Sequence, residues 1–209
     1  MIHKNMKFIL GTKQNMVQVW DEDGKCYPAT LLVAGPVVVT QIKTKDKDGY
    51  VAVQVGFGEK NTRNINKATK GHIKDLGNFR YLKEFRMNEE DADKLKVGDK
   101  VELTCFEEGD VVRVSGVSKG KGFQGVVKRH GFHGGPRSHG QKHSEREPGS
   151  IGATGPQRVF KGVRMAGRMG SDRVTVKNLK VLGIDKETNS MLILGSIPGK
   201  KGTLIEIVG

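Results

Sequence analysis

The chain has 209 residues, 35% of them hydrophobic, and carries 36 Lys and Arg against 23 Asp and Glu, for a net charge of +13. This length suits one large domain or two small ones, and the excess positive charge indicates a polyanionic partner. The longest apolar run, residues 31–39, contains Gly35 and Pro36 and is far shorter than the roughly 20 residues that span a bilayer, which argues against a membrane protein.

The two cysteines, Cys26 and Cys105, lack a metal-binding spacing. They predict two buried thiols in a reducing compartment, with a single disulfide as the alternative. The first residues lack the apolar segment of a secretory signal. We therefore expect a cytoplasmic protein.

From residue 7 the chain reads as short strands separated by turns. Val, Ile, Thr and Tyr alternate with polar residues, as a half-buried pleated surface requires. The expected strands are residues 8–10, 16–20, 29–33, 37–42 and 50–55. Residues 45–49, KDKDG, should form the polar tip of a hairpin between the last two.

Residues 58–100 have a different composition and residue pattern, which predicts a small mixed α/β insertion. Residues 60–70, KNTRNINKATK, are polar and basic, so they form either a solvated loop or a second contact surface. Apolar residues recur every three positions through residues 72–86, which predicts a short helix interrupted by Gly77.

The strand pattern then returns on both sides of a glycine-rich segment. Strands are expected at residues 101–106, 110–117, 173–176, 179–184, 190–197 and 203–208. Regular short strands with turn signals predict a mainly β protein, either a barrel or a sandwich. One core, residues 1–115 and 171–209, is thus interrupted by residues 116–170.

Residues 116–170 hold nearly all of the excess charge. They contain 14 of the 29 glycines, 11 of the 36 Lys and Arg, four of the six histidines and only two acidic residues, for a net charge of +9. A segment with so few large apolar residues cannot recover its ordering entropy by burial. It is therefore either disordered or held by a polyanion.

Several site motifs were tested on this segment and rejected. Residues 120–125 read GxGxxG, but the glycine- and proline-rich continuation VVKRHGFHGGP argues against the helix that a dinucleotide site needs. The four histidines have no cysteine nearby, and we expect polar RNA contacts rather than zinc ligands. No nucleophile–base set or carboxylate pair is readable. We expect no enzyme activity, no metal, no cofactor and no small-molecule substrate.

What remains is a basic arm for nucleic acid on a β-core. Glycines let the backbone approach phosphates, cations neutralise them, and Phe123 and Phe132 suit packing on bases or ribose. Phe160 is expected to pack locally at the base of the arm. The candidate RNA-binding residues are Lys119, Lys121, Phe123, Lys128, Arg129, His130, Phe132, His133, Arg137, His139, Lys142, His143, Arg146, Ser150, Arg158, Lys161, Arg164 and Arg168.

Three segments of the sequence resemble a known family. VSGVSKGKGFQGVVKRHGF (residues 114–132), EPGSIGATGPQRVFKGVRMAGRMG (residues 147–170) and DRVTVKNLKVLGID (residues 172–185) are similar to bacterial-type ribosomal protein three of the large subunit. ILGTKQNMVQVWDEDGKCYPATLL near the start and KEFRM around Phe85 are similar as well. The resemblance covers essentially the whole chain.

The resemblance implies a translation-protein type β-barrel with an α/β insertion and a long loop that enters large-subunit rRNA toward the peptidyl-transferase centre. It also implies binding near the 3′ end of 23S-type rRNA, a part in nucleating subunit assembly, and neighbouring large-subunit ribosomal proteins as partners. On this basis Lys119, Lys121, Phe123, Lys128 and Arg129 would enter the rRNA at the start of the loop. His143, Arg146, Pro148, Ser150 and Ile151 would lie around its deep tip, and Lys161, Arg164 and Arg168 would line its return strand. The alternative function is a free RNA chaperone or a nucleoid-type nucleic-acid-binding protein.

Overall fold

The computed structural model describes residues 7–209, apart from the side chain of Asp75; residues 1–6 of the predicted core lie outside this range. The chain forms two compact units. Met1–Val117 with Arg173–Gly209 is here called the barrel unit, and Ser118–Asp172 is called the extension. The strand pair at the junction ends with Val117 opposite Arg173, so both ends of the extension lie two residues later in the sequence than expected.

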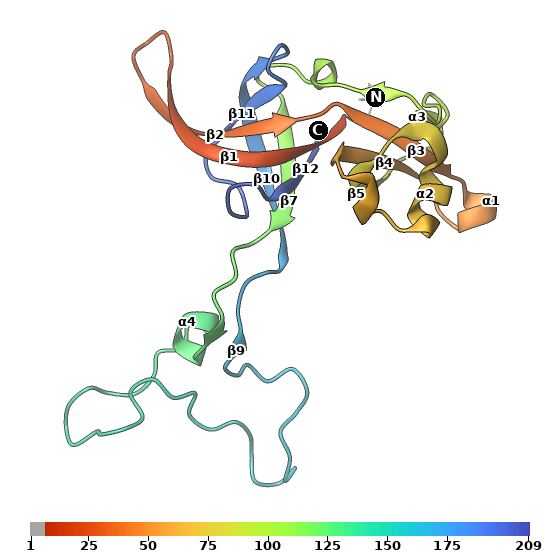
Figure 1. Ribbon diagram of the computed structural model, residues 1–209. Helices are drawn as coiled ribbons and strands as arrows, with labels where there is room; N and C mark the ends of the chain where they lie inside the picture. The colour runs from red at the N-terminus through yellow and green to blue at the C-terminus, as the bar shows by residue number, and fades with distance from the viewer. Residues whose placement is uncertain (1–6) are drawn as a thin grey trace. The chain divides into compact units, whose positions relative to one another are not determined.

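Six antiparallel strands close into a barrel in the order β1-β12-β7-β10-β11-β2 (Figure 1). The mainly β class is therefore confirmed, and of the two architectures left open, the barrel is the one formed. Strands from the two ends of the chain lie side by side, because β1 pairs with β12. The barrel strands are β1 (Phe8–Trp20), β2 (Cys26–Ala34), β7 (Val111–Val117), β10 (Arg173–Asp185), β11 (Ser190–Leu194) and β12 (Leu204–Val208).

Every second side chain of β11 and β12 fills the barrel. In β11 the side chains of Met191 and Ile193 are fully buried, and in β12 those of Ile205 and Ile207 are. Their neighbours along each strand are only half buried. Each fully buried side chain of this size contributes about 1.5–3 kcal/mol relative to exposure. This period of two is why the strands could be read from the sequence.

A second sheet, with strand order β5-β4-β3-β6, forms the α/β part of the barrel unit. Its strands are β3 (Val37–Lys43), β4 (Ala52–Glu59), β5 (Phe79–Arg86) and β6 (Lys100–Val101), with the helices α1 (Lys45–Asp48), α2 (Lys67–Ile73) and α3 (Glu89–Ala92) and the 3₁₀ turns η1 (Thr62–Asn64), η2 (Lys74–Leu76) and η3 (Leu103–Cys105). The hairpin β3–β4 pairs with β5 and β6, so the second sheet already begins before residue 58.

The prediction of a short helix within residues 72–86 is wrong. Helix α2 ends at Ile73, Gly77 has a φ of +131°, and residues 79–86 form strand β5. Strand β5 pairs along its whole length with β4, where Phe79 packs over Gly56, a residue with no side chain to obstruct the ring. A cross-strand partner decided the structure here, and a local spacing of three residues could not reveal it.

Contacts between the second sheet and the barrel include an aromatic pair and an ion-pair network. The rings of Phe8 on β1 and Phe85 on β5 lie with their centroids 4.7 Å apart. Glu206 on β12 bonds to Lys83 Nζ on β5 at 3.0 Å and also to the guanidinium of Arg173 on β10. Burial acts to raise the pKa of the Glu206 carboxyl, but hydrogen bonds from Arg173 and Lys83 outweigh it and hold that pKa below its ordinary value.

Both cysteines are free, but Cys26 is exposed and only Cys105 is partly buried. The expectation of two buried thiols is therefore wrong for Cys26, which begins a strand at the end of the β1–β2 hairpin. No helix among residues 7–209 is long and apolar enough to cross a membrane.

Candidate nucleic-acid interface

The first and last residues of the extension are hydrogen-bonded to each other through their backbones. Ser118 N donates to Asp172 O at 2.9 Å, and Lys121 N donates to Met169 O at 2.9 Å. The pairing continues as a short antiparallel sheet of β8 (Phe123–Gln124) and β9 (Gly167–Arg168). The outgoing and returning segments are thus fixed to each other at the base of the extension.

Gly170 shows why this base needs glycine. Its φ is +79°, and a Cβ added there would lie less than 3.0 Å from the carbonyl oxygen of Lys119. We expected the glycines of this segment to admit phosphate to the backbone. At Gly170 the missing side chain instead admits the chain's own backbone.

A one-turn helix follows the GxGxxG run. The glycines and the proline that follow this run argued against a helix, yet α4 (Val126–His130) begins directly after Gly125. The helix has five residues, and the preceding strand β8 is paired antiparallel to β9. A dinucleotide site requires a parallel βαβ unit, and this arrangement is not one.

Two of the predicted RNA-binding residues on α4 bond within the extension. Arg129 Nη1 donates to Met165 O at 2.6 Å, and His130 Nε2 lies 3.1 Å from the same oxygen. The Arg129 guanidinium lies against Gly167, where a Cβ would be 2.8 Å from Nη1. Both side chains are half buried. They tie α4 to the returning segment.

The exposure of the three aromatic residues of the extension differs from the prediction. Phe132 is half buried, with its ring centroid 6.1 Å from that of His130 and 5.7 Å from the Arg164 guanidinium carbon. Phe123 is 76% exposed and Phe160 is 52% exposed. The expectation that Phe160 packs at the base of the arm is therefore wrong, and Phe160 offers a free ring face that the candidate set omitted.

The nearby Arg158 is the sequence feature that could have identified Phe160 as a candidate RNA-binding residue. Its guanidinium carbon lies 5.5 Å from the Phe160 ring centroid, a cation–π arrangement at i and i+2 in the sequence. A cation next to an exposed aromatic ring is a common way of stacking on a nucleic-acid base. The pair Arg158 and Phe160 thus resembles a stacking platform in composition.

All of the remaining candidates have exposed side chains. They are Lys119, Lys121, Lys128, His133, Arg137, His139, Lys142, His143, Arg146, Ser150, Arg158, Lys161, Arg164 and Arg168. Within the extension, which is described throughout, only two of the cations form ion pairs: Arg137 with Glu145 at 2.6 Å and Arg168 with Asp172 at 3.4 Å. Exposed pairs of this kind contribute about 0–1 kcal/mol, so most of this positive charge lacks an internal counter-charge.

The candidate histidines do not form a metal site. Among residues 7–209 no group of three or more His, Cys, Asp or Glu side chains is placed to hold a metal ion. Next to His130 and His133 the extension instead has a hollow of about 630 Å³, whose walls include Phe132, Ser144 and Arg164. An aromatic ring, a hydroxyl and a guanidinium around one hollow suit an unpaired nucleotide.

The sequence comparisons agree on one family. The family model for ribosomal protein L3 matches residues 45–206. The large ribosomal subunit protein uL3 of Finegoldia magna is 47% identical over 205 residues, covering 97% of this chain and 97% of the relative. The proteins of the same name from Corynebacterium aurimucosum and Herpetosiphon aurantiacus are 50% and 51% identical, covering 99% and 95% of this chain and 95% and 94% of those relatives. The chain therefore belongs to the ribosomal protein L3 family, whose members are structural components of the ribosome and not enzymes.

Proposed function

We propose that the extension binds large-subunit rRNA of the 23S type near its 3′ end, helps to nucleate subunit assembly and supports the peptidyl-transferase region. Membership of the L3 family makes the chain a structural constituent of the large ribosomal subunit, located in the ribosome. One observation carries the finer proposal: the extension presents a long set of exposed cations with almost no acidic side chains to balance them.

The chemistry of binding would be neutralisation of phosphates. Each Lys or Arg that contacts a phosphate releases condensed counterions, which supplies affinity that does not depend on base sequence. The exposed rings of Phe123 and Phe160 would stack on unpaired bases. Arg129 and His130 would act mainly by holding α4 against the returning segment.

The physical effect would be to let rRNA helices converge. Phosphate backbones repel one another where helices pack, and a thin, glycine-rich, positively charged segment can lie between them. Such a role needs no catalytic group. The further partners on this proposal are neighbouring large-subunit ribosomal proteins, and in bacteria the location would be the cytoplasmic ribosome.

Deletion of the extension tests the proposal. Val117 and Arg173 are directly paired on β7 and β10, so a two-residue turn joining them should leave the barrel unit folded. We expect a cooperative unfolding transition and an affinity for a large-subunit rRNA transcript that is at least about a hundredfold weaker than for the full chain. Equal affinities would show that the barrel unit supplies the binding, and the proposal would fail.

A charge-matched pair of full-length variants removes the ambiguity of a deletion. The first replaces Lys119, Lys121 and Lys161 by Gln, and the control replaces Lys45, Lys47 and Lys186 by Gln; all six are exposed. We expect the first variant to lose far more affinity and to show a smaller salt dependence. A wild-type affinity for duplex DNA equal to that for rRNA, with the same salt dependence, would instead favour the free chaperone or nucleoid-type function.

A further inference from the structure

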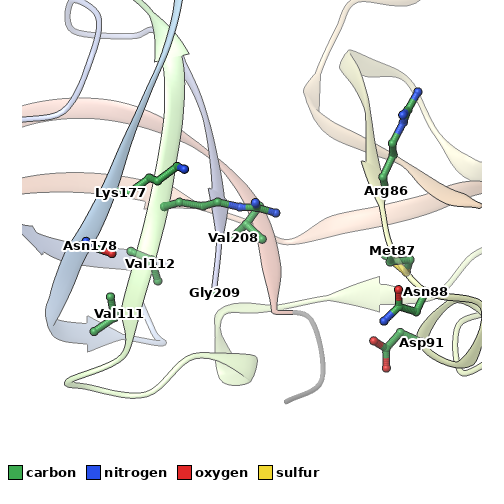
Figure 2. A pocket seen from close by; sticks show the side chains of 11 residues that line it. Arg86, Met87, Asn88, Asp91, Val111, Val112, Lys177, Asn178, Val208 and Gly209 are labelled. Carbon is green, nitrogen blue, oxygen red and sulfur yellow. The ribbon is translucent and has the colours of Figure 1, made fainter. Parts of the chain in front are cut away.

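A groove in the barrel unit has the chemistry of an anion site, although it lies outside the extension. It has a volume of about 560 Å³ and is lined from two sides. Figure 2 shows Arg86 and Asn88 on one side and Lys177, Asn178 and Val111 on the other. Its residues come from four separated stretches of the sequence, so no sequence motif marks it.

A β-bulge sets one wall of this groove. The register of β10 against β7 shifts between Val176 and Leu179, so that Lys177 and Asn178 together stand opposite Arg113. Asn178 has a φ of +58°, in the left-handed region. Bulges redirect side chains and are frequent beside binding sites. Here the bulge brings Lys177 and Asn178 to the same groove as Arg113.

The charges in the groove are unbalanced. Arg113 and Lys177 are exposed and make no ion pair with any residue in the part of the chain that the structure describes. The acidic side chain in the lining, Asp91, is already paired with Lys94 at 2.9 Å. Like charges on facing positions of paired strands are destabilising. The side chains that line the groove therefore carry a net positive charge, which favours binding of an anion.

The other groups that line the groove indicate which kind of anion it would bind. Arg86 adds a third cation, and its guanidinium carbon lies 4.8 Å from the Tyr50 ring centroid, which orients it. Asn88 and Asn178 supply amide donors and acceptors. Val111, which is 57% exposed, supplies an apolar surface. Cations, amides and an apolar patch together match the phosphate, the 2′-hydroxyl and the ribose of an RNA backbone.

We propose that this groove is a second RNA site, which holds a short ribose–phosphate segment of the large-subunit rRNA independently of the extension. This proposal depends on the proposed function only because it assumes that the bound polyanion is rRNA. Arg113 and Lys177 would contact phosphates, and Asn178 would reach a 2′-hydroxyl.

The test uses the full chain and a large-subunit rRNA transcript as the probe. The groove variant carries Arg113→Gln and Lys177→Gln, and its control carries Lys45→Gln and Lys47→Gln, two exposed residues of α1 that remove the same charge. Counterion release at about 0.15 M salt is worth roughly four- to fivefold in affinity per phosphate contact. We expect the groove variant to bind about twentyfold more weakly, with a salt slope lower by about 1.5, and the control to change far less.

Two further measurements separate the possible outcomes. Thermal unfolding shows whether the groove variant is folded, and Arg113→Lys, which keeps the charge but loses the planar fork, should give a smaller loss of affinity. Groove and control variants with equal affinity and slope would overturn the proposal. So would a groove variant that binds rRNA normally but no longer binds polyglutamate, because the site would then suit an acidic peptide.

The groove proposal can fail or stand separately from the proposed function. Combining the groove variant with the Lys119, Lys121 and Lys161 variant should add their losses in free energy if the two sites are independent. Loss only in the groove variant would refute the role of the extension, and loss only in the extension variant would refute the groove.

Discussion

Gly170 allows the pairing at the base of the extension to be tested by a single methyl group. Its φ is +79°, and an added Cβ would lie less than 3.0 Å from Lys119 O. Gly122 has a similar φ of +67° on the facing segment, but nothing lies within 4 Å of its added Cβ. Gly170→Ala and Gly122→Ala therefore share a conformational penalty of about 1 kcal/mol. They differ only in the collision with the backbone.

The size of the difference follows from the hydrogen bonds beside Gly170. Relieving the collision requires the two segments to separate, which breaks Lys121 N to Met169 O and Ser118 N to Asp172 O, each 2.9 Å long. At about 1 kcal/mol for each bond, Gly170→Ala should weaken the closed base by about 3 kcal/mol in total, against about 1 kcal/mol for Gly122→Ala.

Amide hydrogen exchange measures this difference directly. Since 1.4 kcal/mol is about a factor of ten, the Ser118 and Lys121 amides should exchange roughly thirtyfold faster in Gly170→Ala than in Gly122→Ala. The affinity for rRNA should fall in the same order. Equal exchange rates in the two variants would show that the base admits a Cβ without opening. Unprotected amides in the wild type would show that the base is not paired in the free chain.

Three further predictions concern the rest of the molecule. Because the folded-state pKa of Glu206 is depressed, its bonds to Lys83 and Arg173 should stabilise the fold at neutral pH and be lost as pH falls below about 4.5 through the folded pKa. Glu206→Gln should therefore lower the free energy of unfolding by about 1–2 kcal/mol at pH 7 and flatten its decline in acid, as urea titrations at several pH values would measure; an unchanged acid decline would contradict this. Cys26 is exposed, whereas burial raises the pKa of Cys105 to about 11, so a thiol reagent at pH 7.5 should modify Cys26 first, which peptide mass mapping would show; equal rates would refute the difference. Between α4 and β9, apart from the contact of residues 134–135 with Glu145, the extension should exchange its amides rapidly in the free protein and slowly on rRNA. Slow exchange throughout this stretch in the free protein would contradict the inference that rRNA orders it.

The barrel could be predicted because its strands carry their own signal. β11 and β12 are short runs of mostly apolar residues, and burial alternates along both. Residues 79–86 could not be assigned in this way, because their pairing with β4 and the packing of the Phe79 ring over Gly56 involve another strand. The sequence offered a spacing of three, and the sheet pairing overrode it.

Composition predicted which segment forms the candidate interface, but not what each side chain does there. A count of charges treats Arg129 and Lys128 alike, yet Lys128 is exposed and Arg129 bonds to Met165 O, 36 positions away. Such a contact depends on how the outgoing and returning segments meet. The groove around Arg113 and Lys177 could not be predicted from the sequence for the same reason, because only the bulge in β10 brings those charges together.

The glycines of the extension explain how a segment without an apolar core can still be shaped. Gly134 and Gly170 have φ values of +74° and +79°, and an added Cβ at either would lie less than 3.0 Å from a backbone oxygen, that of Glu145 or Lys119. The segment is therefore drawn together at two points where only glycine fits. Each such point divides a long loop into shorter ones and removes ordering entropy that rRNA binding would otherwise have to supply. On this argument the free energy of phosphate contact is needed to order only the stretches between these points, and not the extension as a whole.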